Sequence, residues 1–265
     1  MDNLASVYMR IGRHSDAEAL YRREVALDRR VLGPEHPDTI SGVHNLATAY
    51  RAEGKYVQAD SLFGEALAAR RKALGVDHWE TQDTVFSLAI SYRAQGRYPE
   101  AASLMEHAAE KLRRGLGPDH PLTLQVLYNL AEVYRLQGRW SKAESLYKTV
   151  LEVRRRILGP DNSYTAQVLA SIGEVNLDRH EYVEAEEPLR EALRVRRKKS
   201  PDEWRRYYTE SMLGAALAGL GRQTEAEPLA TSGYQGMLAR QSSIPFGNRG
   251  DLERARRWRD QVTQR

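Results

Sequence analysis

Residues 32–39 read LGPEHPDT, and this octapeptide returns three times in altered form. The copies are LGVDHWET at 74–81, LGPDHPLT at 116–123 and LGPDNSYT at 158–165, so successive copies begin 42 residues apart. A fixed period of this size is typical of a solenoid, in which each unit buries its apolar face only against its neighbours. Such a protein usually works as a binding surface and seldom as a catalyst.

The composition fits a soluble helical array and limits its chemistry. The chain has 265 residues, of which 41% are hydrophobic and 29% charged, and it contains no cysteine. Disulfides, thiol chemistry and cysteine-ligated metals are therefore excluded. No apolar stretch approaches the ~18 residues of a membrane-spanning helix, and no secretion signal is visible at the N-terminus. We therefore expect a cytoplasmic protein without membrane attachment.

One repeat, residues 40–81, shows the helical pattern. Apolar side chains recur at spacings of three and four over residues 40–53, which predicts an amphipathic helix. Gly54 suits the left-handed turn that closes such a helix. A second helix is expected from about residue 57 to 74, where Gly75 ends it. The apolar residues of the first helix are Val43, Leu46, Ala47 and Tyr50.

A small residue marks the second helix of each repeat. A small side chain at this position predicts close packing of the second helix on the first. The last two repeats drift from the pattern, since His180 stands where earlier repeats have the turn glycine and the step from there to Gly221 is 41 residues. The small residues in one phase are Ala17, Ala59, Ala101, Ala143 and Ala185.

These patterns predict an all-α fold, a right-handed superhelical solenoid of antiparallel helix pairs. Residues 241–265 are expected to form a loop and a C-terminal capping helix, with Leu252, Ala255 and Trp258 on its apolar side. The first unit lacks its opening turn, so we expect a fragment, a late start codon or further repeats upstream. The array is expected over residues 1–240, in units of about 1–39, 40–81, 82–123, 124–165, 166–206 and 207–240.

Within each repeat, a Leu-Ala pair followed by Tyr, then Gly-x-Tyr and Ala-Glu-x-Leu-Tyr, resembles the tetratricopeptide repeat. The 42-residue form, with Leu-Gly-Pro-Asp-His-Pro and with Asn-Leu-Ala in the first helix, is similar to the kinesin light chain repeats and their bacterial relatives. The Asn-Leu-Ala triplets begin at Asn3, Asn45 and Asn129. The resemblance covers about residues 1–240, and it implies a protein-binding array without defining the partner.

A second resemblance concerns the end of the array. Residues 226–234 and 244–247 look similar to the end of repeat arrays that follow serine/threonine kinase domains in some bacteria. The chain has no kinase motif of its own. This resemblance implies that the chain is the repeat region of a larger signalling protein.

The resemblance also implies that the first helices line a concave groove. With Ile40 counted as position 1, the helical period places positions 2, 5, 6, 9, 12 and 13 of a repeat on one side. Position 6 carries Asn45 and Asn129, whose amides donate and accept hydrogen bonds and so can pair with the backbone of an extended peptide. The related repeats use asparagine here for that purpose. The alternative is a structural asparagine bonded to a neighbouring helix.

Charged and aromatic residues complete the candidate peptide-binding site. Arginines at position 12 could bind acidic side chains or a C-terminal carboxylate by bidentate pairing, or they could be solvated charges favoured by the helix dipole. Phe86 and Tyr128 would form an aromatic pocket, or they would serve ordinary packing between units. The arginines are Arg51, Arg93 and Arg135, and the candidates at positions 5 and 9 are His44, Phe86, Tyr128, Thr48 and Glu132.

Basic clusters recur near the end of the second helices. They complement the negative end of each helix dipole and explain the net charge of +4 without nucleic acid. A ridge of such clusters could still bind RNA, which is the weaker interpretation because charge alone is a poor indicator. The clusters are residues 29–30, 70–72, 113–114, 154–156 and 196–199.

No sequence motif points to catalysis. His-Glu-x-x-His, phosphate-loop and nucleophile-elbow patterns are absent, so we expect no enzymatic activity and no metal or cofactor. We expect a scaffold or adaptor that binds an extended peptide segment, acidic in character, of a partner protein in the groove. The alternatives are self-assembly through an N-terminal edge that exposes Leu4 and Tyr8, a regulatory fragment of a larger protein, and RNA binding.

Overall fold

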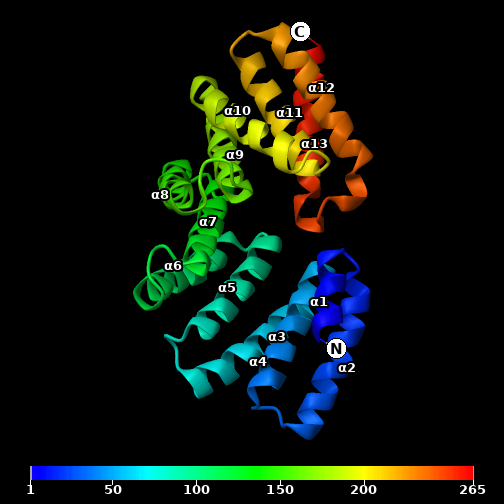
Figure 1. The fold of residues 1–265 in the computed structure, drawn as a ribbon, viewed down its shortest axis with the longest axis vertical. Helices are drawn as coiled ribbons and strands as arrows, with labels where there is room; N and C mark the ends of the chain where they lie inside the picture. Colours follow the sequence, from blue (N-terminus) through cyan, green and yellow to red (C-terminus); the bar gives the residue numbers. More distant parts are fainter. Residues whose placement is uncertain (1, 265) are drawn as a thin grey trace. The chain divides into compact units, whose positions relative to one another are not determined.

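The computed structural model describes residues 2–264, and within that range it contains thirteen α-helices, two short 3₁₀ helices and no strand (Figure 1). The predicted all-α solenoid of helix pairs is confirmed. The first seven helices are α1 (Asp2–Arg10), α2 (His14–Val31), α3 (Pro37–Ala52), α4 (Tyr56–Leu74), α5 (Trp79–Ala94), α6 (Tyr98–Gly115) and α7 (Pro121–Leu136). The others are α8 (Trp140–Leu158), α9 (Ser163–Asp178), α10 (Tyr182–Lys199), α11 (Trp204–Gly219), α12 (Gln223–Ala239), η1 (Gln241–Ser243), η2 (Phe246–Asn248) and α13 (Arg249–Thr263).

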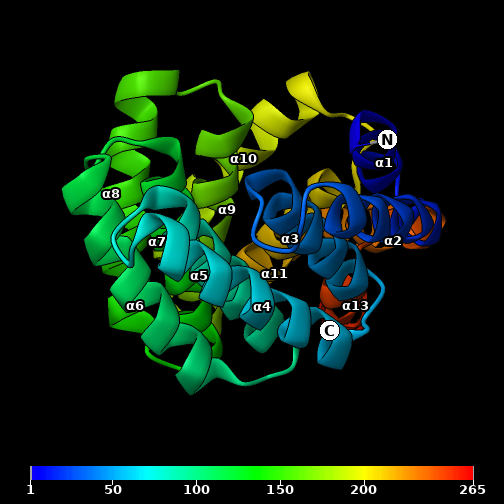
Figure 2. The same ribbon diagram turned by 90° about the horizontal axis from the view of Figure 1, so that it is seen from below.

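The helices divide into two compact units, and the boundary falls inside α7. Unit 1 ends at Val133, and unit 2 begins at Tyr134. In unit 1, each of the helices α1 to α5 packs against the next one along the chain, as the run from α3 to α6 shows (Figure 2). In unit 2, α8 to α12 follow the same order, and α13 packs on both α11 and α12.

Small side chains let the two helices of a pair approach closely. The alanine that recurs early in each second helix is completely buried in every repeat. An alanine there leaves room for the first helix of the same pair, because its side chain is a single methyl group. The residues, all 0% exposed, are Ala17, Ala59, Ala101, Ala143, Ala185 and Ala226.

The turn inside a pair has the same geometry even where its glycine is lost. Gly54 closes α3 with a φ of 79°, and the next N–H, that of Lys55, donates to the carbonyl of Tyr50 at 2.9 Å. His180 replaces the glycine after α9 and still adopts the left-handed conformation, with a φ of 60°. The following N–H, of Glu181, donates to the carbonyl of Asn176 at 2.8 Å. The turn therefore keeps its backbone hydrogen bond without a glycine. Glycine only avoids the steric strain that a side chain meets at a positive φ.

The recurring octapeptide joins the helix pairs. Its last threonine donates a hydrogen bond to the carbonyl of its glycine, as Thr39 does to Gly33 at 2.8 Å and Thr165 to Gly159 at 2.9 Å. Its histidine caps the next helix, since His36 Nδ1 accepts from the N–H of Asp38 at 3.2 Å. This histidine therefore has a structural role, as the cap of the next helix.

Buried arginines from the basic clusters also join neighbouring pairs. The Nη1 group of Arg70 donates to the carbonyl of Glu80 at 3.0 Å. Arg154 reaches the carbonyl of Tyr164 at 2.9 Å, and Arg196 reaches that of Arg205 at 2.9 Å. Each of these three arginines near the end of a second helix therefore holds the first turn of the next helix. Part of the basic charge is used within the fold.

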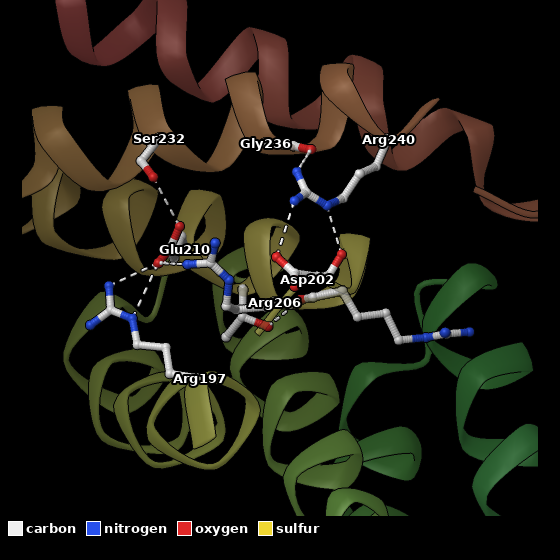
Figure 3. A network of polar contacts seen from close by, with 9 residues as sticks. Arg197, Asp202, Arg206, Glu210, Ser232, Gly236 and Arg240 are labelled. Carbon is white, nitrogen blue, oxygen red and sulfur yellow. Dashed lines mark hydrogen bonds and ion pairs between the residues drawn. The ribbon is translucent and has the colours of Figure 1, made fainter. Parts of the chain in front are cut away.

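A buried carboxylate connects three helices of unit 2. Glu210 of α11 is 1% exposed and accepts hydrogen bonds from Arg206 Nη1 at 2.8 Å, from Arg197 Nη2 at 2.8 Å and from Ser232 Oγ at 3.1 Å. Figure 3 shows Arg197 approaching from α10 and Ser232 from α12. Arg240 at the end of α12 donates to the backbone carbonyl of Asp202 at 2.6 Å. These contacts tie the last helix pair to α10.

Candidate functional site

In unit 1, the first helices carry two arginines that have no acidic partner. Arg51 lies on α3 and Arg93 on α5, and neither side chain forms an ion pair with any residue in the described range 2–264. The Nε atom of Arg51 is buried without a hydrogen-bond acceptor. Burial and the nearby charge of Arg93 lower the pKa of Arg51 to about 10. A half-buried cation without a carboxylate partner is unfavourable, so this pair is suited to bind an anion.

The predicted amides and arginines meet at one point in unit 1. Arg93 Nη1 donates to Asn129 Oδ1 at 3.1 Å. The Nδ2 group of Asn129 donates to the carbonyl of Gln125 in its own helix at 2.9 Å. We name the surface formed by His44, Arg51, Arg93 and Asn129 the cationic face of unit 1.

His44 contributes to this face as a neutral side chain. Burial lowers its pKa to about 3, and the charges of Arg70 and Arg51 act in the same direction. The ring packs edge-on against Phe63, with centroids 5.4 Å apart, and Nε2 lies 3.8 Å from a carboxylate oxygen of Asp83. An uncharged imidazole leaves the positive charge of the face to the arginines.

The remaining candidates of unit 1 differ in accessibility. Phe86 is 5% exposed and packs in the interior, while Asn45, Tyr128 and Glu132 are half-buried. The hydroxyl of Thr48 donates to the carbonyl of His44 at 3.1 Å, within its own helix. Of this group, Asn45, Tyr128 and Glu132 therefore have exposed surface that a ligand could contact.

Arg135, the third predicted arginine, lies in unit 2 and is neutralised there. Its side chain is 10% exposed, and Nη1 lies 3.0 Å from Asp178 and 3.4 Å from Glu174, both on α9. These acidic residues stand at positions 9 and 13 of their repeat, on the side that the helical period assigns to the first-helix surface. Arg135 therefore differs from Arg51 and Arg93, because its charge is already paired.

The C-terminal helix occupies the surface around Arg135. Arg254 of α13 forms ion pairs with both Glu174 and Asp178, the latter at 2.7 Å. Tyr208 of α11 donates to Glu174 at 2.9 Å, and the ring of Trp258 stacks on that tyrosine with centroids 5.8 Å apart. We name the surface formed by Glu174, Asp178 and Tyr208 the anionic face of unit 2.

Sequence reasoning missed this second face. The repeat count places Glu174 on the groove side, but it does not single this residue out. The available signal is the acidic residue at position 13, where the earlier repeats have Ala52, Ala94 and Leu136. In the terminal helix, Arg254 and Trp258 stand four residues apart and so lie on the same side of the helix. This spacing is the signal in α13 that corresponds to the acidic residue at position 13.

Several features bear on the other functional classes. Within residues 2–264, no group of three or more histidine, aspartate or glutamate side chains is arranged to hold a metal ion. No helix in the described part of the chain is both long and apolar enough to cross a bilayer. Near the N-terminus, Leu4 is 50% exposed and Tyr8 is half-buried.

Comparisons with known proteins identify the repeats. The tetratricopeptide repeat family matches residues 1–78, 81–155 and 123–198. A search of curated proteins found no match. The crystal structure of BtubC (BKLC) from P. vanneervenii is similar over 86% of this chain and 92% of that one, with 22% identity and a TM-score of 0.74.

Two crystal structures of a putative kinesin light chain with nearly identical TPR-like repeats from Podosopora anserina are also similar. One, of a point variant, has 26% identity and a TM-score of 0.64, and the other has 26% identity and a TM-score of 0.63. Each match covers 75% of this chain and 94% of the other. The chain belongs to the tetratricopeptide repeat family, and its repeats are of the kinesin light chain-like type.

Proposed function

We propose that this chain is a protein-interaction scaffold that binds an extended, acidic peptide segment on the cationic face of unit 1. Tetratricopeptide arrays generally act as protein-binding scaffolds, because stacked helix pairs present a long continuous surface. The observation that carries the proposal is the pair of arginines, Arg51 and Arg93, without an acidic partner in the described chain. A carboxylate from a ligand would supply the missing partner.

Each side chain of the face has a distinct part in this proposal. Arg51 and Arg93 would bind a glutamate or aspartate side chain of the ligand by charge-assisted hydrogen bonds. Asn45 and Asn129 would bind the peptide backbone, which every sequence presents, so they would add affinity without selectivity. Tyr128 would contact an apolar ligand residue next to the acidic one. Arg135 stays a weaker candidate for acid selection, because Asp178 already pairs with it.

The proposal predicts that Arg51→Met weakens binding without weakening the fold. One charge-assisted hydrogen bond contributes about 1.5–3 kcal/mol, so we expect an affinity loss of about 10- to 100-fold. The free energy of unfolding should stay constant or rise, because methionine removes a half-buried cation that has no carboxylate partner. The measurements are fluorescence anisotropy with an acidic peptide enriched from a random display library, and urea unfolding of the same two proteins.

Matched variants separate the site from general electrostatics. Arg93→Met should act as Arg51→Met does, and the double change Asn45→Ala with Asn129→Ala should weaken all enriched peptides alike. The control is Arg30→Met with Arg71→Met, two exposed arginines at the ends of second helices, which should leave affinity unchanged. The proposal is wrong if the control loses as much affinity as Arg51→Met, or if the library yields no acidic peptides at all.

A further inference from the structure

In the part of the chain that the structure describes, the two carboxylates of the anionic face of unit 2 are paired by Arg135 and by Arg254 of α13. Glu174 and Asp178 together carry two negative charges, and Arg135 supplies one positive charge between them. The second positive charge comes from Arg254, which pairs with the same two carboxylates. If α13 left this surface, one carboxylate charge would lack a partner in a half-buried setting. The face therefore favours a cationic ligand.

The face also has a fixed aromatic element. Tyr208 is held by its hydrogen bond to Glu174, and burial together with that carboxylate keeps its pKa well above the usual range. Its ring therefore stays neutral and available for stacking, which Trp258 uses. Within α13, the guanidinium of Arg254 lies 4.9 Å from the centre of the Trp258 ring, so one helical turn presents both groups together.

The attachment of α13 rests on few buried groups. Of its side chains, only Ala255 and Val262 are fully buried, while Leu252 and Trp258 are partly buried against the core of unit 2. A pocket lined by Leu177, His180 and Ala218, among others, lies beside Trp258, so packing around the ring is incomplete. A helix with little buried apolar area opens at a lower free energy than the core helices do.

We propose that the anionic face of unit 2 is a binding surface for a basic helix that carries an arginine four residues before a tryptophan, and that α13 is its exchangeable intramolecular occupant. A partner helix of this chemistry would displace α13 by pairing its arginine with Glu174 and Asp178 and stacking its tryptophan on Tyr208. This surface is separate from the cationic face of unit 1, and it selects ligands of the opposite charge.

The test uses the full chain and a labelled synthetic peptide with the sequence of residues 249–263. In the intact protein the attached helix competes at a high effective concentration, so the free peptide should bind weakly. The double variant Arg254→Glu with Trp258→Ala should release α13 and bind the peptide at least tenfold more tightly than the unaltered chain. A peptide with the same two changes should not bind.

Controls make the test specific. Arg256→Glu changes an exposed charge on the outer side of the same helix and should leave peptide binding as weak as in the unaltered chain. A scrambled peptide of identical composition should not bind the double variant. Absence of binding to the folded double variant, or equal binding of the scrambled peptide, would overturn the proposal.

A second measurement on the unaltered chain covers the case in which the double variant does not fold. In hydrogen–deuterium exchange, the amides of α13 should exchange at least tenfold faster than those of α11 and α12, because α13 opens on its own. Equal protection of the three helices would show a permanent structural cap and would refute the exchange of α13.

Docking of α13 should also strengthen as the pH falls from about 7 to 5. Burial and the charge of Glu174 raise the pKa of Asp251, in the first turn of α13, to about 6, against the opposing effects of Asn248, Arg254 and Arg135. The docked state thus binds this proton more tightly than the undocked state, so protonation favours docking. The protection factor of the α13 amides, which is corrected for the pH dependence of intrinsic exchange, should rise as the pH falls over this interval, and Asp251→Asn should remove the rise. A lower protection factor at pH 5 would contradict this assignment.

Discussion

Replacing Glu210 with alanine is expected to lower the free energy of unfolding by about 3–5 kcal/mol, since removing one partner of a buried ion pair leaves the other uncompensated. The carboxylate is 1% exposed and accepts from Arg206, Arg197 and Ser232. The side chain of Arg206 is only 16% exposed, so it could not recover full hydration. Urea unfolding followed by circular dichroism measures the loss.

Two further variants test whether charge is the cause. Other repeats carry Val43, Val85 and Leu169 at the position of Glu210. The double change Glu210→Leu with Arg206→Met should therefore recover most of the lost stability, because it removes both buried charges. Glu253→Ala, at an exposed site on α13, should change stability by less than about 0.5 kcal/mol. A loss for Glu210→Ala as small as that of Glu253→Ala would show that the network contributes nothing.

The same substitution, glycine to alanine, should have opposite effects at Gly233 and Gly64. A Cβ at Gly233 in α12 would lie 2.6 Å from the backbone nitrogen of Ser211 and 2.6 Å from the carbonyl oxygen of Tyr207. These are backbone atoms of α11, so they cannot rotate away. We expect Gly233→Ala to lower the free energy of unfolding by about 1–3 kcal/mol through overpacking.

Gly64 supplies the internal control for this prediction. It lies in the middle of α4 with open space where a Cβ would stand. Gly64→Ala should raise the free energy of unfolding by about 0.5–1 kcal/mol, because alanine loses less backbone entropy in a helix. Thermal or urea unfolding of both variants gives the comparison. Destabilisation by Gly64→Ala would contradict the argument from helix entropy, and unchanged stability in Gly233→Ala would contradict the argument from close packing.

The helix pairs could be predicted because their determinants are local and repeat. The second helix expected from about residue 57 to 74 is observed as Tyr56–Leu74, where a glycine follows its last residue. The first helix, expected at 40–53, is Pro37–Ala52. It begins earlier because the ring of His36 caps it, an interaction that an apolar pattern does not show.

The charges of the candidate site could be placed on one side of the helices, but their partners could not be predicted. Arg51, Arg93 and Arg135 occupy the same repeat position, yet only Arg135 meets a carboxylate, one full repeat away at Asp178. The position of α13 depends on a contact between residues 80 apart, Arg254 and Glu174. An ion pair between residues so far apart depends on tertiary packing. The 42-residue repeat of the sequence therefore does not predict it.

The arginine contacts between neighbouring pairs decide where such an array can be cut and extended. Arg70 reaches over the loop to the backbone of Glu80, and Arg154 and Arg196 make the same connection later in the chain. A repeat-length cassette spliced within the octapeptide would separate each arginine from its native carbonyl unless the inserted block kept the same phase. A splice at the tight turn after Gly54 would leave every such connection inside one cassette. Gene duplication or protein engineering that lengthens this array should therefore succeed with junctions inside a helix pair.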